Sequence, residues 1–132
     1  MGSLTTTALN DAVDGFTGTA DPTYFTNSTK YIAMFNGDPE SGGTELTSTL
    51  TGASTRAAIT SAMGSASSGS ATNSSEIEIV SSASGGATID YIAIYSAATA
   101  GQLLGKDSVT SKAVSAGDGV KINASGLTIS AS

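Results

Sequence analysis

The side chains that could support catalysis in this 132-residue chain are few, and their spacing indicates structural roles. A serine nucleophile with a lysine base can be drawn from Ser108 or Ser111 beside Lys112. With 22 Ser and four Lys in the chain, however, such proximity is expected by chance. Glu76 and Glu78 are two residues apart in an alternating, strand-like segment, which is typical of a solvent-facing strand rather than of a catalytic carboxylate pair.

Metal ligands would have to be oxygen atoms, because the chain contains no Cys and no His. This composition also excludes thiolate nucleophiles, disulfide scaffolds, Ser-His-Asp triads and the usual zinc sites. Asp118 stands between two glycines without any neighbouring Asp-x-Asp spacing, and Asp38 precedes Pro39, so both are interpreted as turn residues. We therefore expect no catalytic residue, no cofactor and no enzyme activity, while an oxygen-ligated metal ion is left open.

Arg56 is the only arginine in the chain. A guanidinium can fork to a carboxylate or to backbone carbonyls and so hold two segments together. The favoured hypothesis is that Arg56 is a structural anchor, and capture of a ligand is the alternative.

The overall composition indicates a folded domain with a thin core. Ser, Thr, Ala and Gly make up 77 of the 132 residues, whereas Leu, Ile, Val and Phe together make up 24. The net charge is −6 with five basic residues, which argues against binding to nucleic acid. The longest apolar run, residues 91–95, is too short to cross a membrane. A core this thin favours stabilisation by assembly with other subunits.

One amphipathic helix is predicted, over residues 3–16. Apolar residues recur every four positions, and Ser3 is the expected N-cap. The N-terminus carries neither a basic region nor an apolar stretch, so no signal peptide is expected. The apolar stripe is formed by Leu4, Ala8, Ala12 and Phe16, with Leu9 and Val13 beside them.

From residue 29 onward the apolar period changes to two, which predicts short strands separated by turns. The segment 61–75 consists of small and polar residues and is expected to be an exposed loop. The strands at 120–122 and 127–129 are expected to form a final hairpin. The other predicted strands span 30–35, 55–60, 75–80, 88–95, 102–109 and 112–114.

This pattern predicts a mainly β fold, namely a single antiparallel β-sandwich or jelly-roll-like domain with a short N-terminal helix. Within that one domain, residues 1–18 would form the helical segment and residues 19–132 the sandwich. Strands 30–35 and 88–95 carry apolar side chains on both faces, so each is expected to be buried on both sides.

The order of motifs resembles that of a family of small virion structural proteins of tailed bacteriophages, often labelled tail fibre protein. The chain departs from the usual family pattern in having Ser54 and Thr55 where an aromatic residue often precedes the arginine, and in lacking Trp. The matching segments are YIAMFNGDP at 31–39, GGTEL at 42–46, RAAI at 56–59, residues 73–79, IYSA at 94–97, GQLL at 101–104, AGDGVKI at 116–122 and GLTI at 126–129.

The resemblance implies a non-enzymatic component displayed on the virion exterior, either a tail fibre or appendage or a capsid decoration protein, which works by multivalent assembly. The chain would be made in the host cytoplasm. The implied partners are further copies of the chain and other virion structural proteins, with no nucleic acid and no membrane. The copies would form a trimer, by analogy with phage appendage proteins, or an array fixed by the lattice of the particle. The N-terminal helix is the expected contact element, because its apolar stripe is broad. The expected assembly contacts are Leu4, Leu9, Val13 and Phe16.

An alternative function is a carbohydrate- or host-surface-binding adhesion module, because aromatic rings stack on sugars. The four tyrosines that suggest it are Tyr24, Tyr31, Tyr91 and Tyr95.

Overall fold

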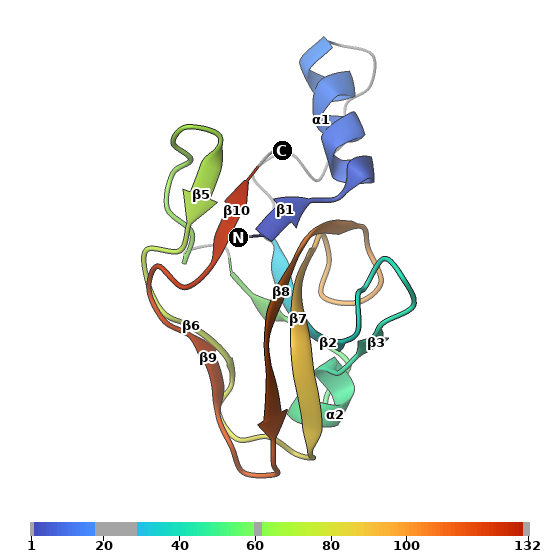
Figure 1. Ribbon diagram of the computed structural model, residues 1–132, viewed down its shortest axis with the longest axis vertical. Coiled ribbons are helices and arrows are strands. Elements are labelled where there is room, and N and C mark those ends of the chain that lie inside the picture. Colours follow the sequence, from blue (N-terminus) through green and yellow to red (C-terminus); the bar gives the residue numbers. More distant parts are fainter. Residues whose placement is uncertain (1, 18–28, 60–61, 131–132) are drawn as a thin grey trace.

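The computed structural model describes residues 2–17, 29–59 and 62–130. The described chain is mainly β, with a short helix near the N-terminus, and this confirms the predicted fold class (Figure 1). The elements are β1 (Gly2–Leu4), α1 (Thr6–Thr17), β2 (Tyr31–Asn36), β3 (Thr44–Glu45), α2 (Thr47–Thr51), β4 (Ala57–Ala58), β5 (Ser70–Thr72), β6 (Ile77–Val80), β7 (Ala87–Tyr95), β8 (Leu103–Val114), β9 (Val120–Ile122) and β10 (Thr128–Ser130).

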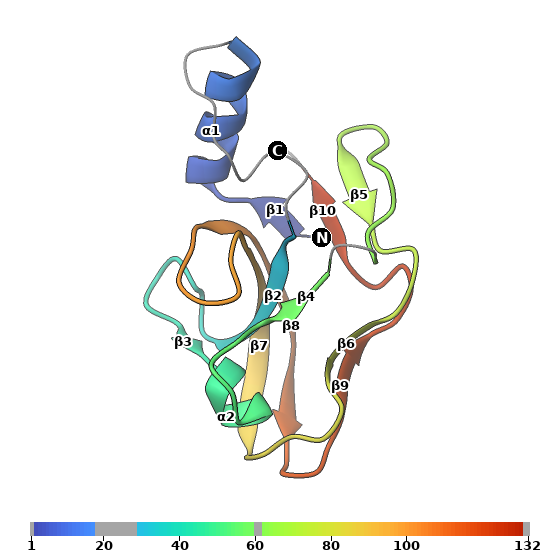
Figure 2. The ribbon, with the colours of Figure 1, turned by 180° about the vertical axis from the view of Figure 1, so that it is seen from behind.

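The strands form two sheets. The larger has eight strands in the order β3-β2-β7-β8-β1-β10-β5, with β4 pairing with β2, and the smaller consists of β6 and β9. The pairs are antiparallel except for β1 with β10, which is parallel. Figures 1 and 2 show the β6–β9 ribbon standing beside the long strands β7 and β8. The main core contains side chains from both sheets, so the arrangement is sandwich-like.

The two faces of β2 enter two different cores, as the alternation of its side chains predicts. Ile32 and Met34 join the main core between the sheets. Ala33 and Phe35 point to the other face, where they pack with Ala93 of β7. Both faces of the strand are therefore buried by groups of this chain.

The long strand β8 replaces the two shorter strands that the sequence predicts at 102–109 and 112–114. Its pairing with β7 shifts register between Ile89 and Tyr91. Ile89 and Ile92 consequently both reach the main core although they are three residues apart. An irregularity of this kind hides the period-two pattern, which is why the sequence suggests a break in β8.

The N-terminal helix begins later than expected because the residues before it form a strand. Gly2–Leu4 pairs with both β8 and β10, so Leu4 belongs to β1 and not to the helix. The expected cap at Ser3 is wrong, and Thr5 takes that place. The hydroxyl of Thr5 accepts a hydrogen bond from the Ala8 amide at 3.2 Å and donates one to the Leu103 carbonyl at 2.8 Å.

The predicted final hairpin is wrong. Val120–Ile122 pairs with β6, and Thr128–Ser130 pairs with β1 and β5, so the two segments lie in different sheets. The short turn between them connects one layer to the other instead of two neighbouring strands.

Within the segment 61–75, the described residues 62–75 are not the exposed loop that the composition predicts. Ser70–Thr72 forms β5 against β10, and a bridge joins Met63 to Asn73. Asn73 is 1% exposed, and its side chain makes three hydrogen bonds. Its amide group donates to the carbonyls of Ser75 and Asn123, and its oxygen accepts from the Leu127 amide at 2.8 Å. Backbone partners far away in sequence therefore order a stretch that is poor in apolar side chains.

The turn predicted after β2 is present and depends on two glycines. Gly37 has a φ of +87°, in the left-handed region. A Cβ at Gly43 would lie 2.3 Å from the Gly37 carbonyl oxygen, so no side chain fits there.

No helix in the described ranges has the length and apolarity that a membrane crossing requires.

Candidate functional site

Helix α1 stands at one end of the molecule, away from the sandwich (Figures 1 and 2). It contacts β8, and Ala8 is buried at 1% exposure. Val13 is 60% exposed, and Leu9 is partly buried. The helix thus presents an apolar side chain to solvent on an element that has few contacts with its own domain.

The four expected assembly contacts do not form one helical stripe. Leu4 lies in β1, partly buried, whereas Leu9 and Val13 lie on α1. The side chain of Phe16 is outside the described part of the structure. The only other large apolar side chain exposed among the described residues is Val109 on β8, at 38%.

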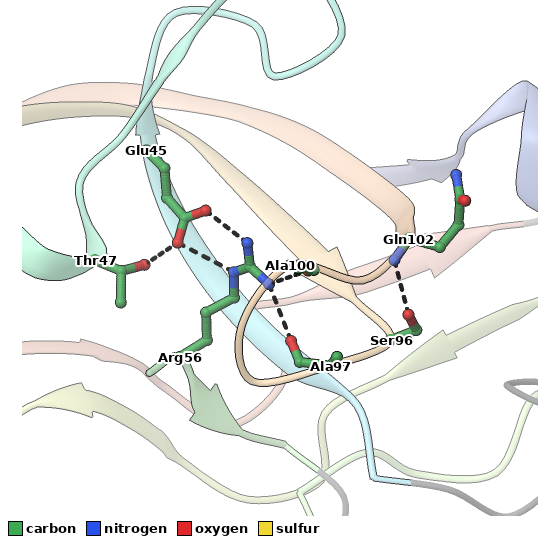
Figure 3. Close-up of polar contacts among 7 residues, drawn as sticks. All are labelled: Glu45, Thr47, Arg56, Ser96, Ala97, Ala100 and Gln102. Atoms are coloured by element: carbon green, nitrogen blue, oxygen red, sulfur yellow. Dashed lines mark hydrogen bonds and ion pairs between the residues drawn. The ribbon is translucent and has the colours of Figure 1, made fainter. Parts of the chain in front are cut away.

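Arg56 lies just before β4 and reaches three other segments (Figure 3). Its Nε and Nη2 donate to the two carboxylate oxygens of Glu45 at 3.1 and 2.7 Å. Its Nη1 donates to the carbonyls of Ala97 and Ala100 at 3.0 and 2.7 Å. The guanidinium carbon lies 3.7 Å from the centre of the Tyr95 ring, and 7% of the side chain is exposed. These contacts of Arg56 join β3 to β7 and to the loop that follows β7. That Arg56 stabilises the fold as an anchor is still a prediction.

The surroundings of Arg56 shift the ionisation of its two neighbours. Burial opposes the ionisation of Glu45, but hydrogen bonds from Arg56 and Thr47 and the Arg56 charge outweigh it and lower the pKa of that carboxyl. Burial raises the pKa of the Tyr95 hydroxyl, and the charge on Arg56 opposes this shift in part. The ring of Tyr95 also stacks on Phe35, with 6.3 Å between the ring centroids. The Tyr95 ring thus has contacts with both Arg56 and Phe35.

A second charged cluster ties the turn after β2 to β8. The Nζ of Lys106 lies 2.7 Å from both carboxylate oxygens of Asp38 and 2.8 Å from a carboxylate oxygen of Glu40. The hydrogen bond from Lys106, followed by one from the Glu40 amide, lowers the pKa of Asp38. Hydrogen bonds from Lys106 to the carboxylates of Asp38 and Glu40 raise the pKa of Lys106. Asp38 is a turn residue, as expected, with an additional ionic partner.

The remaining residues considered for chemistry do not gather in one cleft of the described structure. Ser108 lines a cleft with Tyr91 and Lys106, whereas Lys112 lines a different cleft with Ile89. Glu76 and Glu78 are exposed, and Asp118 accepts a hydrogen bond from the Ser115 amide within a turn. Across the residues that the structure describes, no three His, Cys, Asp or Glu side chains lie close enough together to hold a metal ion.

Sequence reasoning missed the most important partners of these residues. Glu45 is part of the GGTEL segment, but nothing local shows that its carboxylate would meet Arg56. Asn73 is recognisable only as one polar residue in a polar stretch. Its position in the sequence hardly indicates its role, because its backbone partners at Asn123 and Leu127 are brought to it only by the fold.

Comparison with known proteins addresses the whole chain at once. A family model described as podophage GP4 fiber I protein gp80 matches residues 3–130. No curated protein matches the chain significantly in sequence. The family match confirms the expected resemblance to virion structural proteins of phages and extends from β1 to β10. The chain therefore belongs to the podophage GP4 fiber I protein gp80 family, and it is a phage fibre protein, a structural component of the virion.

Proposed function

We propose that the chain is displayed on the outside of the phage particle as a fibre subunit that assembles through α1. Its partners are further copies of itself, in a trimer, and the virion proteins that hold the fibre. The family supports the fibre part of this proposal, because its members are described as fibre proteins. The work of such a subunit is physical, since it buries apolar surface against its neighbours and needs no catalytic residue.

The observation that carries the proposal is the exposure of Val13 on α1. A valine that passes from solvent to a packed interface contributes about 1.5–3 kcal/mol when fully buried. Because α1 stands away from the sandwich, a neighbour can approach it without disturbing the two cores (Figure 2). Leu9 lies one helical turn away and extends the same apolar surface.

A charge placed on α1 tests the proposal without disturbing the sheet. In the full chain, Val13→Asp should reduce the oligomer to monomers in sedimentation or light scattering, while the urea midpoint stays within error of the wild type. Val109→Asp is the matched control, because it makes the same change at the other exposed apolar residue. Deletion of residues 1–18 is a poorer test, since it also removes β1 from the middle of the large sheet.

The proposal is wrong if the wild-type chain stays monomeric, or if Val13→Asp leaves the oligomer intact. Loss of the oligomer in Val109→Asp alone would place the contact on β8 instead. Quantitative densitometry of purified particles separates the two virion locations. A fibre subunit should be present at a few copies per tail, whereas a capsid decoration protein should approach the number of shell subunits.

Adhesion to a host glycan is a second candidate, supported by one cleft. Tyr91 lines a cleft of about 220 Å³ together with Asp38, Lys106 and Asp107, which combines an aromatic ring with hydrogen-bonding groups. Tyr95 is less suited because Arg56 and Phe35 contact its ring, and Tyr24 lies outside the described residues. Binding to an array of bacterial surface glycans should be lost in Tyr91→Ala and kept in both Tyr91→Phe and the control Tyr31→Ala. Equal binding by all variants contradicts this candidate.

A further inference from the structure

Strands β8 and β9 leave the same tight turn but do not pair with each other. The turn at 115–119 is closed by a hydrogen bond from the Asp118 amide to the Ser115 carbonyl at 3.0 Å. It is also held by Ala83, whose amide donates to the Asp118 carbonyl at 2.7 Å. From this turn β8 enters the large sheet, whereas β9 pairs with β6 (Figure 1). The two strands diverge instead of forming a hairpin.

The divergence leaves a long backbone edge of β8 without a partner strand. On that side β1 pairs with β8 only at Gly105 and Lys106. Beyond this point the described strands offer β8 a partner on its β7 side only. Residues 108–113 are all exposed. The register with β7 shifts within this stretch, between Ser108 and Lys112, and the backbone donors and acceptors of its other edge are groups that another strand can use.

A cleft of about 340 Å³ lies between this part of β8 and β9. Its apolar lining comes from Ile89, Val114 and Val120, and Ile89 and Val114 belong to the main core. Its charged lining comes from Lys112 and Lys121, two of the five basic residues in the chain. Lys121 pairs with Glu76 at 3.1 Å, and that contact is largely exposed.

We propose that this cleft binds an extended segment of another polypeptide, which adds to the free edge of β8 and alternates apolar residues with carboxylates. Its backbone would pair with residues 108–113, its apolar side chains would cover Val114 and Val120, and its carboxylates would meet Lys112 and Lys121. The proposal concerns the end of the molecule opposite α1, so it is independent of the assembly helix (Figure 1).

The charges favour an acidic strand over a second copy of β8. Two β8 edges brought together would each contribute Lys112, and a lysine on an edge strand is a common barrier against self-pairing. The same lysine attracts a segment that carries carboxylates, so one residue both rejects the wrong partner and selects the right one. Strand β6, which carries Glu78 between apolar residues, is already paired with β9. The expected occupant is therefore a segment of a different protein.

A synthetic peptide tests this site directly on the full chain. The probe is an acetylated, dye-labelled nine-residue peptide, TVEVEVEVT, and its binding is followed by fluorescence anisotropy. The comparison peptide, TVKVKVKVT, has the same apolar pattern with the opposite charge. The acidic peptide should bind at least about tenfold more tightly than the basic one, because it meets two lysines instead of repelling them. Backbone amides at 108–113 should gain protection from hydrogen exchange when it binds.

Charge reversal at the cleft should weaken the acidic peptide and nothing else. Lys112→Glu should reduce its affinity by about fivefold or more, from the loss and inversion of one partly exposed ion pair. The double variant Thr7→Glu, Asn10→Glu adds the same charge on exposed positions of α1 and should leave binding unchanged. Val13→Asp should also bind normally, which keeps this test separate from that of the assembly helix.

Three results would overturn the proposal. The first is no binding of either peptide, and the second is equal binding of both. The third is binding that protects amides elsewhere, such as those of β3, while the amides of residues 108–113 stay unprotected. Formation of dimers without peptide, lost on Lys112→Glu, would instead assign the edge to a second copy and equally reject an acidic partner.

Discussion

The guanidinium of Arg56 lies 3.7 Å from the centre of the Tyr95 ring and covers one face of it. The Tyr95 ring also stacks on Phe35, with 6.3 Å between the ring centroids, and both rings belong to the second core, which contains Ala33 and Ala93. Arg56 therefore adds a cation to the aromatic contacts of this core. A residue of the short segment between α2 and β4 thereby contacts a side chain of β7.

Substitution of Arg56 should destabilise the domain strongly. Arg56→Ala should lower the free energy of unfolding by about 2–3 kcal/mol, because it leaves the partly buried Glu45 carboxylate and two carbonyls without their donor. Arg56→Lys should recover less than half of this, since an ammonium cannot fork to both oxygens. Urea denaturation measures the change, with Lys121→Ala of the exposed pair as a control that should cost less than about 0.5 kcal/mol. A loss that small for Arg56→Ala would refute the anchor role.

Stability should fall in acid. The pKa values of Glu45 and Asp38 are held below the ordinary values of 4.5 and 3.8, so the unfolded chain binds protons at a higher pH than the folded one. The stabilisation is complete above those ordinary values and is lost as the pH falls through the lower folded values. Urea midpoints between about pH 2 and 7 should show this fall. Glu45→Gln should flatten it, and an unchanged slope in that variant would contradict the role of Glu45.

Asn73 should be among the residues least tolerant of substitution. Asn73→Ala should lower the free energy of unfolding by about 3 kcal/mol, because it removes three hydrogen bonds and leaves one amide and two carbonyls without their partner. Asn123→Ala is a matched control, since Asn123 takes part through its backbone carbonyl and its side chain is exposed. Thermal unfolding should show a large loss for the first variant and almost none for the second. Similar losses for both would indicate a local turn effect instead.

The cap of α1 should contribute to the stability of the N-terminal segment. Thr5→Val keeps the shape of the buried side chain but loses both hydrogen bonds of its hydroxyl, at a cost of about 2 kcal/mol. Thr5→Ser keeps the hydroxyl and should recover most of the loss. Hydrogen exchange of the α1 amides measures the local stability of the helix, and urea unfolding measures the stability of the whole domain. Full stability in Thr5→Val would show that α1 forms without this cap.

The faces of the strands could be predicted from the sequence because alternation along a strand is a local property. Ile32 and Met34 enter one core and Ala33 and Phe35 the other, as their order requires. Ile77 and Ile79 point inward and Glu78 outward for the same reason. The turn after β2 could likewise be predicted, since Gly37 can adopt the positive φ of the turn and Pro39 fixes its own φ.

Which strands pair with each other was decided by the tertiary structure. The alternation of residues 120–122 shows which side chains share a face of the strand. It does not show which strand pairs with this one, because the backbone groups that form the hydrogen bonds are the same in every strand. In the structure, residues 120–122 pair with β6 and not with residues 127–129. Because β9 lies in the small sheet, it does not pair with the edge of β8. Ser3 and Thr5 are both suitable caps locally, and the pairing of β1 with β8 and β10 selects Thr5. The apolar stripe of α1 is visible in the sequence, but only the packing of Ala8 toward the domain determines that Val13 stays exposed.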